Sequence, residues 1–317
     1  MDIHKGLQDP KELFKQFKLE SMRASSGKPL TVAWNCTGTY LAAGLTNQYI
    51  RVWSISSGQT IDLAGHYERV DQVCWNPQDP NILASASADK SIKLWDIRKK
   101  QPFASIKTGG QSFSLRWSDD GKYIVTANEN HWISIIDYES KSVIKSKRGD
   151  ITFDVAWDNS GERLFISTSH GDVNVMSWPD YELQHTMKGH TSSCYCISKD
   201  ASGRYLAVGS ADALISIWDL EDYICIRTIT DHIHPVTALS FSHDSQFLAS
   251  NDEEPTIHVS DVDTGELIHK FDIQGQASYL AWHPKKHILA VVGESRYNGV
   301  SRPFVQLFKE PKYKDYS

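Results

Sequence analysis

The side chains best suited to chemistry in this chain are two histidines, each followed by a serine and an aspartate. The two sets have nearly the same spacing: His66, Ser87 and Asp89, and His190, Ser210 and Asp212. A histidine that is hydrogen-bonded to a carboxylate can act as a general base toward a hydroxyl group. Each set is therefore a candidate catalytic group, provided that the surrounding elements leave it accessible to a substrate.

No other motif for catalysis, phosphate binding or metal binding stands out. The sequence lacks G-x-x-x-x-G-K-S/T, G-x-S-x-G and H-E-x-x-H. Cys194 and Cys196 form a lone C-x-C, whereas zinc usually needs about four ligands, from two such pairs or from added histidines. His283 and His287 resemble a ligand pair but occupy a turn of the repeat described below. We predict that the chain is not an enzyme and has no cofactor and no metal site.

Composition and charge exclude several classes of protein. The chain has 317 residues, of which 40% are hydrophobic and 23% charged, as in ordinary globular proteins. Its 33 Lys and Arg against 39 Asp and Glu give a net charge of -6, so no chain-wide basic field exists to hold nucleic acid. The longest aliphatic run, 288–292, is far shorter than the roughly 20 residues of a membrane span.

The start of the chain and its cysteines point to an intracellular protein. Residues 1–10 contain no apolar stretch of the kind that forms the core of a signal peptide. The five cysteines are an odd number in a long chain, which is typical of reduced thiols rather than of a disulfide framework.

A repeat of about 40 residues runs through the chain and predicts the elements that position these side chains. Its clearest mark is an apolar-x-aromatic triplet, as in Val32-Ala33-Trp34, followed by a turn and an apolar pair, as in Leu41-Ala42. The anchor residue of the triplet recurs at positions 34, 75, 117, 157, 199, 241 and 282. Each copy continues with strict two-residue alternation, as in Ile92 and Leu94, which indicates a strand. This period predicts an all-β, seven-bladed β-propeller.

The copies resemble WD40 repeats. The resemblance rests on Leu94-Trp95-Asp96 and Ile217-Trp218-Asp219, each preceded by a Gly-His pair, at 65–66 and 189–190. In the WD40 family a histidine, a serine, an aspartate and a tryptophan form a buried hydrogen-bonded set. The resemblance implies two such sets: His66, Ser87, Asp89 and Trp95, and His190, Ser210, Asp212 and Trp218. Because these residues recur in register with the fold repeat, we favour a structural role over a catalytic one.

Some copies depart from this pattern. Lys199 replaces the aromatic anchor of the fifth copy, His170 or Gly171 replaces the turn aspartate of the fourth, and Glu254 replaces it in the sixth. A buried histidine or aspartate is tolerated only when it is paired. We expect the departing blades to lack the complete set and to be looser.

The ends of the chain predict how the ring closes. Nine residues follow Phe308, too few to give the last blade its outer strand, whereas residues 17–22 have strand-like alternation. Pairing this segment with the seventh blade would remove both open sheet edges. Ahead of it, Asp9 is a candidate helix cap and Pro10 a first helical residue. We predict an N-terminal extension with a short helix (1–16), the propeller (17–308) and a polar tail (309–317).

Longer blocks of sequence resemble the THO complex subunit 3 family. The blocks that carry this second resemblance are 70–77, 209–219, 235–244 and 280–285. Members of that family are nuclear, non-catalytic subunits of the transcription-export assembly, which couples transcription to mRNA packaging and export. The resemblance implies docking on the large helical scaffold subunit, with a DEAD-box RNA helicase and mRNA as indirect partners. The alternative is a WD40 adaptor that reads a peptide tail or degron in ubiquitin or chromatin machinery, which requires acidic and aromatic residues around a channel mouth.

The seventh copy supplies the first candidate for partner contact. It carries about six extra residues at 293–299, which we expect to form an exposed polar loop. Within it, Arg296 and Tyr297 are of the types enriched among interface hot spots. The next candidates are Tyr67, Arg69 and His234.

Three basic groups lie at 98–100, 141–148 and 285–286. They are either a solvated rim or a source of weak, salt-sensitive phosphate contact. No aromatic residues alternate with them, so direct readout of RNA bases is not predicted.

Overall fold

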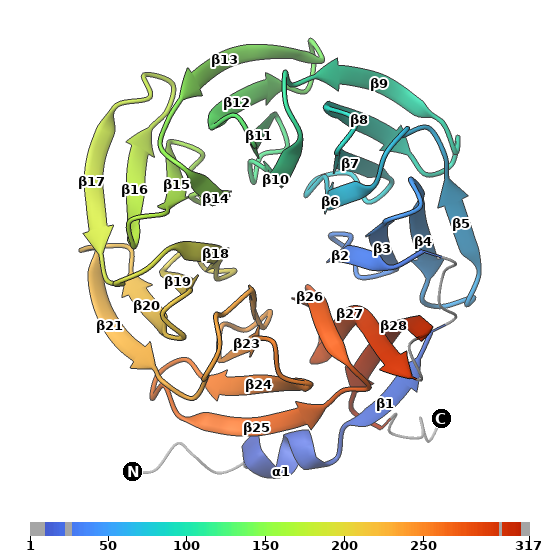
Figure 1. Cartoon of the computed structure of the whole chain (residues 1–317), viewed down its shortest axis with the longest axis vertical. Coiled ribbons are helices and arrows are strands. Elements are labelled where there is room, and N and C mark those ends of the chain that lie inside the picture. Colours follow the sequence, from blue (N-terminus) through green and yellow to red (C-terminus); the bar gives the residue numbers. More distant parts are fainter. Residues whose placement is uncertain (1–9, 23–26, 298–299, 312–317) are drawn as a thin grey trace.

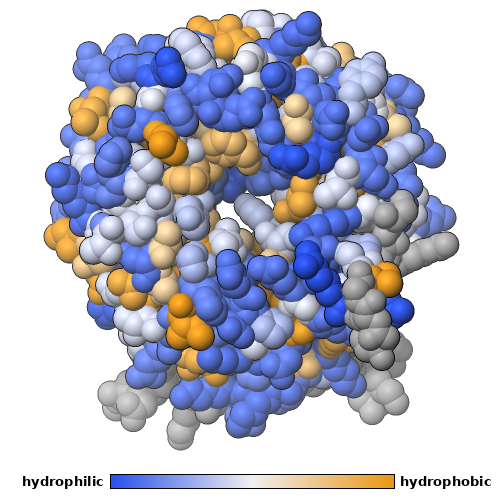
Figure 2. Space-filling view, viewed as in Figure 1, coloured by the Kyte–Doolittle hydropathy of each residue, from blue (hydrophilic) through white to orange (hydrophobic). Residues whose placement is uncertain are grey.

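The computed structural model describes residues 10–22, 27–297 and 300–311. The chain forms seven four-stranded antiparallel sheets, which stand as blades around a central channel (Figure 1). The prediction of an all-β, seven-bladed propeller is confirmed. Figure 2 shows the same disc in space-filling form, with a mouth of the channel at its centre.

The strands of each blade are named from the channel outward. Blade 1 contains β2 (Pro29–Trp34), β3 (Tyr40–Leu45), β4 (Ile50–Ser54) and β5 (Thr60–Leu63). Blade 2 contains β6 (Val70–Trp75), β7 (Ile82–Ser87), β8 (Ser91–Asp96) and β9 (Pro102–Lys107). Blade 3 contains β10 (Ser112–Trp117), β11 (Tyr123–Asn128), β12 (Trp132–Asp137) and β13 (Ser142–Arg148). Blade 4 contains β14 (Thr152–Trp157), β15 (Arg163–Thr168), β16 (Asp172–Ser177) and β17 (Leu183–Lys188).

The remaining blades follow the same order. Blade 5 contains β18 (Cys194–Lys199), β19 (Tyr205–Ser210), β20 (Ile215–Asp219) and β21 (Ile224–Ile229). Blade 6 contains β22 (Ala238–Phe241), β23 (Phe247–Asn251), β24 (Thr256–Asp261) and β25 (Leu267–Asp272). Blade 7 contains β26 (Gln276–Trp282), β27 (Ile288–Tyr297), β28 (Val300–Lys309) and, from the other end of the chain, β1 (Lys18–Ser21).

Because neighbouring strands are antiparallel, the connections fall on two faces of the disc. We call the upper face the one that carries the hairpin between the second and third strands and the connection from each blade to the next. The lower face carries the hairpins between the first and second strands and between the third and fourth. Every turn of the repeat therefore presents its side chains at a defined place on one of the two faces.

The β1 strand closes the ring as predicted. It pairs antiparallel with β28, from Lys18 opposite Lys309 to Ser21 opposite Gln306. This pairing covers an edge that would otherwise be open to another chain.

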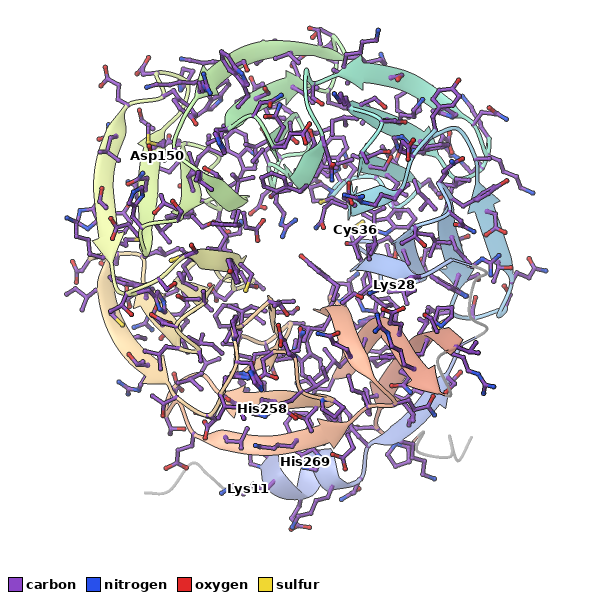
Figure 3. All side chains as sticks on the ribbon, in the orientation of Figure 1. Lys11, Lys28, Cys36, Asp150, His258 and His269 are labelled. Atoms are coloured by element: carbon purple, nitrogen blue, oxygen red, sulfur yellow. The ribbon has the colours of Figure 1, made fainter. Side chains whose placement is uncertain are left out.

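A short helix, α1 (Pro10–Lys15), precedes the closing strand. Its Phe14 is 1% exposed and packs edge-on against Phe247 and Phe271 of blade 6. Figure 3 shows His269 of β25 beside the same helix. The predicted cap, Asp9, lies outside the described residues. In the described part of the chain, no helix has the length and apolar character needed to cross a membrane.

Tryptophan anchors join neighbouring blades. The indole N–H groups of Trp34, Trp75 and Trp117 each donate to a backbone carbonyl of the inner strand of the preceding blade, at 3.0 to 3.1 Å. The same rings are buried between the blades, so one residue supplies both apolar packing and a hydrogen bond. Lys199, which replaces the anchor in blade 5, instead forms an ion pair with Asp119 of blade 3 at 2.7 Å.

Candidate protein-interaction surface

The second blade contains a buried chain of hydrogen bonds. It joins strands β7 and β8 and the turn between them to the connection that leads into the blade. Nδ1 of His66 lies 2.7 Å from Asp89 Oδ2, and its Nε2 lies 2.7 Å from the hydroxyl of Ser85. The indole N–H of Trp95 donates to the same hydroxyl at 2.8 Å. The hydroxyl of Ser85 therefore accepts a hydrogen bond from the indole N–H and donates one to Nε2 of His66. The Nδ1–H of His66 in turn donates to the carboxylate of Asp89.

The serine in this set is Ser85 and not Ser87, so that part of the prediction is wrong. Both residues face the same side of β7, but Trp95 lies opposite Leu83, and Ser85 is the nearer of the two to the indole by one step of the ladder. Ser87 lies at the end of the strand, where its hydroxyl donates to the carbonyl of Arg69 at 2.8 Å.

The fifth blade builds the same set with its serine on a different strand. His190 Nδ1 lies 3.1 Å from Asp212 Oδ2, and its Nε2 lies 2.8 Å from the hydroxyl of Ser216. The indole of Trp218 donates to Ser216 at 2.7 Å. The predicted Ser210 is wrong, because its hydroxyl donates to the carbonyl of Ser192 at the strand end.

The sixth blade holds part of a set that the sequence analysis missed. His232 Nδ1 lies 3.0 Å from Asp252 Oδ2, and its Nε2 lies 2.8 Å from the hydroxyl of Ser250. The carboxylate of this set belongs to Asp252, which stands two residues before Glu254. The expectation that Glu254 replaces the turn aspartate is therefore wrong. No indole completes the set, because Ser260 stands at the tryptophan position and its hydroxyl is buried without a partner.

The spacing contains the signal for this third histidine. His66, His190 and His232 each stand nine residues before the anchor position of their copy. The position of the turn aspartate predicts the set less well. A carboxylate two residues earlier along the strand end, such as that of Asp252, lies on the same side of the sheet and can reach the same histidine.

Burial and protonation indicate that these sets hold the fold together. The side chain of His66 is fully buried, and both of its ring nitrogens are occupied. Burial lowers the pKa of His66 and of His232 in spite of their aspartate neighbours. Burial alone would raise the pKa of Asp89, but hydrogen bonds from Ser91 and His66 hold it below its usual value. Neutral imidazoles with no free nitrogen, out of reach of a substrate, are suited to structure rather than to proton transfer.

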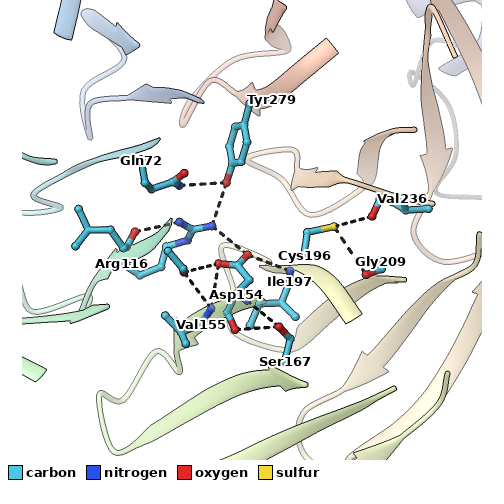
Figure 4. A network of polar contacts seen from close by, with 12 residues as sticks. Gln72, Arg116, Asp154, Val155, Ser167, Cys196, Ile197, Gly209, Val236 and Tyr279 are labelled. Carbon is cyan, nitrogen blue, oxygen red and sulfur yellow. Dashed lines mark hydrogen bonds and ion pairs between the residues drawn. The ribbon is translucent and has the colours of Figure 1, made fainter. Parts of the chain in front are cut away.

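A second polar network spans the channel (Figure 4). The guanidinium of Arg116, on β10, donates to Asp154 of β14 at 3.2 Å and to the hydroxyl of Tyr279 on β26 at 3.0 Å. Gln72 of β6 also donates to Tyr279, at 3.4 Å. Burial would lower the pKa of Arg116, but the Asp154 carboxylate, together with Tyr279 and Cys74, outweighs it and the pKa is raised. Inner strands on opposite sides of the ring are thereby connected.

This network narrows the channel to a cavity of about 340 Å³ that opens toward the lower face. Its charged groups are already matched within the chain. Asp154 is paired with Arg116, and Asp119 with Lys199 at the lower mouth. At the upper mouth Asp71 is paired with Arg69 at 2.8 Å.

The upper face carries the predicted contact residues that the structure describes. Tyr67 is 78% exposed in the connection from blade 1 to blade 2, which also holds Arg69. His234, in the connection from blade 5 to blade 6, lies 3.2 Å from Glu254. The side chain of Arg296 is 80% exposed at the upper end of β27. Tyr297 ends the same strand, and its side chain lies outside the described residues.

The insertion of the seventh copy is a strand extension, so the predicted loop at 293–299 is wrong. β27 and β28 pair over ten residues each, up to Tyr297 opposite Val300. Gly293 allows this, because a Cβ there would lie 2.1 Å from the carbonyl of Gln276. Glu294 holds the base of the extension through an ion pair with Lys28 at 2.8 Å. The candidate contact is a long hairpin that rises from the upper face.

Three aromatic residues around the upper channel mouth were not predicted. They occupy the second position of consecutive inner strands: Phe113, Phe153 and Tyr195. Phe153 and Tyr195 meet at 5.0 Å between ring centroids. Aligning the copies on their anchors would have shown that one repeat position holds an aromatic residue three times in succession.

Comparisons with known proteins agree with this architecture. The family model "WD domain, G-beta repeat" matches residues 18–54, 57–96 and 181–219, and the model of the anaphase-promoting complex subunit 4 WD40 domain matches residues 228–283. THO complex subunit 3 of Arabidopsis thaliana is 34% identical over 303 residues, which cover 92% of this chain and 96% of that protein. The chain belongs to the THO complex subunit 3 family of WD40-repeat proteins.

One further relative contains WD repeats, and one solved structure has the same fold. WD repeat-containing protein AAC3 of Dictyostelium discoideum is 30% identical over 96% of this chain and 69% of its own length. The crystal structure of the Cps50 (Swd1) β-propeller domain of Myceliophteria thermophila superposes with a TM-score of 0.80 at 16% identity, covering 92% of this chain and 99% of that domain. At that identity the likeness shows the fold alone.

Proposed function

We propose that this protein is a non-catalytic docking subunit of a nuclear THO assembly, which couples transcription to mRNA packaging and export. In this proposal it binds the large helical scaffold subunit, and its association with a DEAD-box RNA helicase and with mRNA is indirect. The sequence relationship to THO complex subunit 3 supports the assembly. The buried, fully occupied histidine sets support a role without catalysis.

The distribution of exposed apolar side chains carries the proposal that the upper face docks. In the described chain twelve large apolar side chains are exposed. Half of them belong to the outermost strands, and the lower-face hairpins contribute none. The other half lie on the upper face: Tyr49, Tyr67, Trp132, Ile151, Ile233 and Val300. Exposed apolar groups concentrated on one face are typical of an interaction surface.

The contacts that the three basic groups make agree with an indirect association with RNA. Lys145 Nζ bonds the carbonyls of Pro179 and Asp180, and Lys147 Nζ bonds that of Tyr181, so both help to join blade 3 to blade 4. The groups at 98–100 and 285–286 lie on lower-face hairpins, away from the apolar residues of the upper face. They do not form a continuous track for a phosphate backbone.

The tail-reader alternative is less well supported by the channel. A basic tail needs unpaired acidic groups near the aromatic residues of the mouth. Asp71, Asp119 and Asp154 are each paired with a cation of the same chain, and Glu129, which lies beside Phe113 and Phe153, accepts a hydrogen bond from the backbone N–H of Gln111. A tail would have to break such a pair before it gained one.

Purification of the tagged protein from nuclear extract, followed by mass spectrometry, tests the assembly. We expect the scaffold subunit and the other THO subunits to be recovered. Recovery of ubiquitin-ligase or chromatin subunits in their place would contradict the proposal.

The docking face is tested with matched variants in the same experiment. Tyr67→Ser together with Ile233→Ser removes two exposed apolar side chains of the upper face, and Leu183→Ser together with Ile224→Ser removes two from outermost strands. We expect the first pair to reduce scaffold recovery at limiting concentration and the second to leave it unchanged. Equal recovery with both pairs would show that another surface docks.

A further inference from the structure

The junction of blades 6 and 7 on the lower face brings together three side chains that can bind a metal ion. His243 and Asp244 lie in the hairpin between β22 and β23, and His287 lies in the hairpin between β26 and β27. One ring nitrogen of each histidine and one carboxylate oxygen all lie within 4.8 Å of one another. Nε2 of His287 is 2.9 Å from Asp244 Oδ2. None of these residues takes part in the upper face described above.

The fold does not require these residue types at this junction. The position of His243 is never a histidine in the other six copies, which have Cys36, Pro77, Asp119, Asn159, Ala201 and Pro284. At two other junctions the equivalent hairpins are joined by a neutral bond from a side-chain amide to a carbonyl. Asn76 donates to Gly121, and Asn159 donates to Ala201. The two imidazoles are therefore a particular feature of this junction, whereas the carboxylate has a counterpart in Asp120 of the third copy, which accepts hydrogen bonds from Ser118 and Lys122 in the same way.

An independent observation is that Nδ1 of His243 is buried and has no hydrogen-bond partner. Such a polar atom is unfavourable in a folded protein unless something binds the ring. A neutral imidazole has a lone pair to give to a metal ion.

The surrounding residues hold the other two ligands in place. Oδ1 of Asp244 accepts hydrogen bonds from the hydroxyl of Ser242 at 2.6 Å and from the backbone N–H of Gln246 at 3.3 Å. This leaves Oδ2 directed toward His287. The ring of His287 packs edge-on against Phe247, with centroids 5.6 Å apart. Outer partners of this kind orient metal ligands and strengthen binding.

Contrary to the prediction from the sequence that the chain has no metal site, we propose that His243, Asp244 and His287 bind one Zn²⁺ ion, with water completing its coordination. Two imidazoles and a carboxylate are a ligand set that zinc accepts. The ion would replace the proton shared by His287 Nε2 and Asp244, and the His287 ring would carry its proton on Nδ1 instead. A tetrahedral ion needs ligand atoms about 3.4 Å apart. The most distant pair, now at most 4.8 Å apart, would close in by about 1.4 Å, and His287 Nε2 and Asp244 Oδ2, now 2.9 Å apart, would separate by about 0.5 Å.

Access and charge are compatible with such a site. The side chains of Asp244 and His287 are 23% and 21% exposed, which leaves a path for the ion from solvent. Lys285 and Lys286 lie in the same hairpin as His287, but both are exposed, and salt screens their repulsion of the ion. The ion would join blades 6 and 7 next to the buried rings that receive α1.

Calorimetric titration of the full chain with ZnCl₂, after removal of any affinity tag, tests the site. We expect one ion per chain and a rise in Tm with added zinc. The double variant His243→Gln, His287→Gln should bind at least tenfold more weakly and lose the zinc-dependent rise in Tm. The matched control, His170→Gln with His185→Gln, removes two exposed histidines elsewhere and should titrate as the unmodified chain does.

The conservative variant Asp244→Asn guards against misfolding. It keeps a side-chain oxygen for Ser242 and Gln246 but loses the charge, so its circular dichroism without metal should match that of the unmodified chain while zinc binding weakens. The proposal is overturned if the unmodified chain shows no stoichiometric binding, or if the double variant binds zinc as tightly as the control.

Discussion

Ser216 on β20 lies directly opposite Val208 on β19, and this pair occupies the positions that Lys93 and Ser85 hold in the second blade. The hydroxyl that links histidine to tryptophan has therefore crossed from one strand to its neighbour. Side chains directly opposite one another project from the same side of the sheet, so either strand can deliver the same group.

Moving the hydroxyl back gives a first prediction. Ser216→Ala should lower the free energy of unfolding by about 1 to 3 kcal/mol, because it leaves His190 and Trp218 without their shared partner in a buried site. Adding Val208→Ser to that variant should recover part of the loss by restoring the arrangement of the second blade. Chemical denaturation of the two variants measures both effects. A double variant no more stable than Ser216→Ala would mean that the two positions are not interchangeable.

The pH dependence of stability is a second prediction. Burial, together with the neighbouring His232 and Lys270, lowers the pKa of His258 from 6.5 to about 4. Below pH 6.5 His258 therefore binds a proton in the unfolded chain but not in the folded chain. Its contribution to stability is fully present above this pH and is lost as the pH falls toward 4. Between pH 7 and pH 5 the titration of His258 should lower the free energy of unfolding by about 2 kcal/mol.

His258→Asn isolates that contribution. The free energy of unfolding of the variant should fall less between pH 7 and pH 5 than that of the unmodified chain, by about 2 kcal/mol. Urea denaturation at the two pH values gives the difference. Identical pH slopes for both proteins would contradict the assignment of the proton uptake to His258.

The repeat period predicted the blades correctly because it depends on a property that every copy shares. In every copy apolar and polar residues alternate along the strands, and turn residues separate one strand from the next. An anchor such as Trp75 must also fill the same space between neighbouring blades. Ring closure by β1 was predictable for a similar reason, since a missing outer strand leaves only one segment to supply it.

Residues that act through one particular contact were less predictable. Ser85 and Ser87 have the same type, face and neighbourhood in sequence, and the distance to one indole distinguishes them. The extra length of the seventh copy at 293–299, with its polar residues, predicts a loop, whereas the structure has a hairpin there. Strands that project beyond the body of a sheet are solvated on both sides and so lose the apolar alternation by which strands are recognised.

Ring closure supplies a third prediction. Removing residues 1–24 takes away β1 and α1, which leaves the edge of β28 unpaired and uncovers the pocket of Phe14. We expect a large fall in Tm and aggregation, as seen by size-exclusion chromatography. A truncated protein that stays monomeric with an unchanged melt would show that the ring closes in another way.

The helix contributes separately from the strand. Phe14→Ala should cost about 3 to 5 kcal/mol, because this ring is among the largest fully buried side chains. Leu19→Ala, in the exposed β1, is the matched control and should cost far less. Comparable losses for the two variants would mean that the packing of α1 contributes little.

The last prediction concerns the long hairpin and rests on the proposed docking function. Arg296 projects from β27 with its side chain 80% exposed and has one weak ion pair, to Glu294 at 3.8 Å. Replacing Arg296 and Tyr297 by Ala should therefore leave Tm unchanged. If the hairpin tip is a hot spot, the loss in affinity for the scaffold subunit should be about 2 kcal/mol or more, roughly thirtyfold.

A matched variant makes this result interpretable. Arg98→Ala removes an exposed arginine from a lower-face hairpin, where it pairs with Asp96 at 2.8 Å. We expect it to co-purify with the scaffold subunit as the unmodified chain does, because docking is proposed for the other face. If the hairpin variant also co-purifies normally at limiting concentration, the contact lies elsewhere on the upper face, and Tyr67, Arg69 and His234 are the residues to change next. Loss of binding in both variants would instead indicate that docking depends on overall charge rather than on one face.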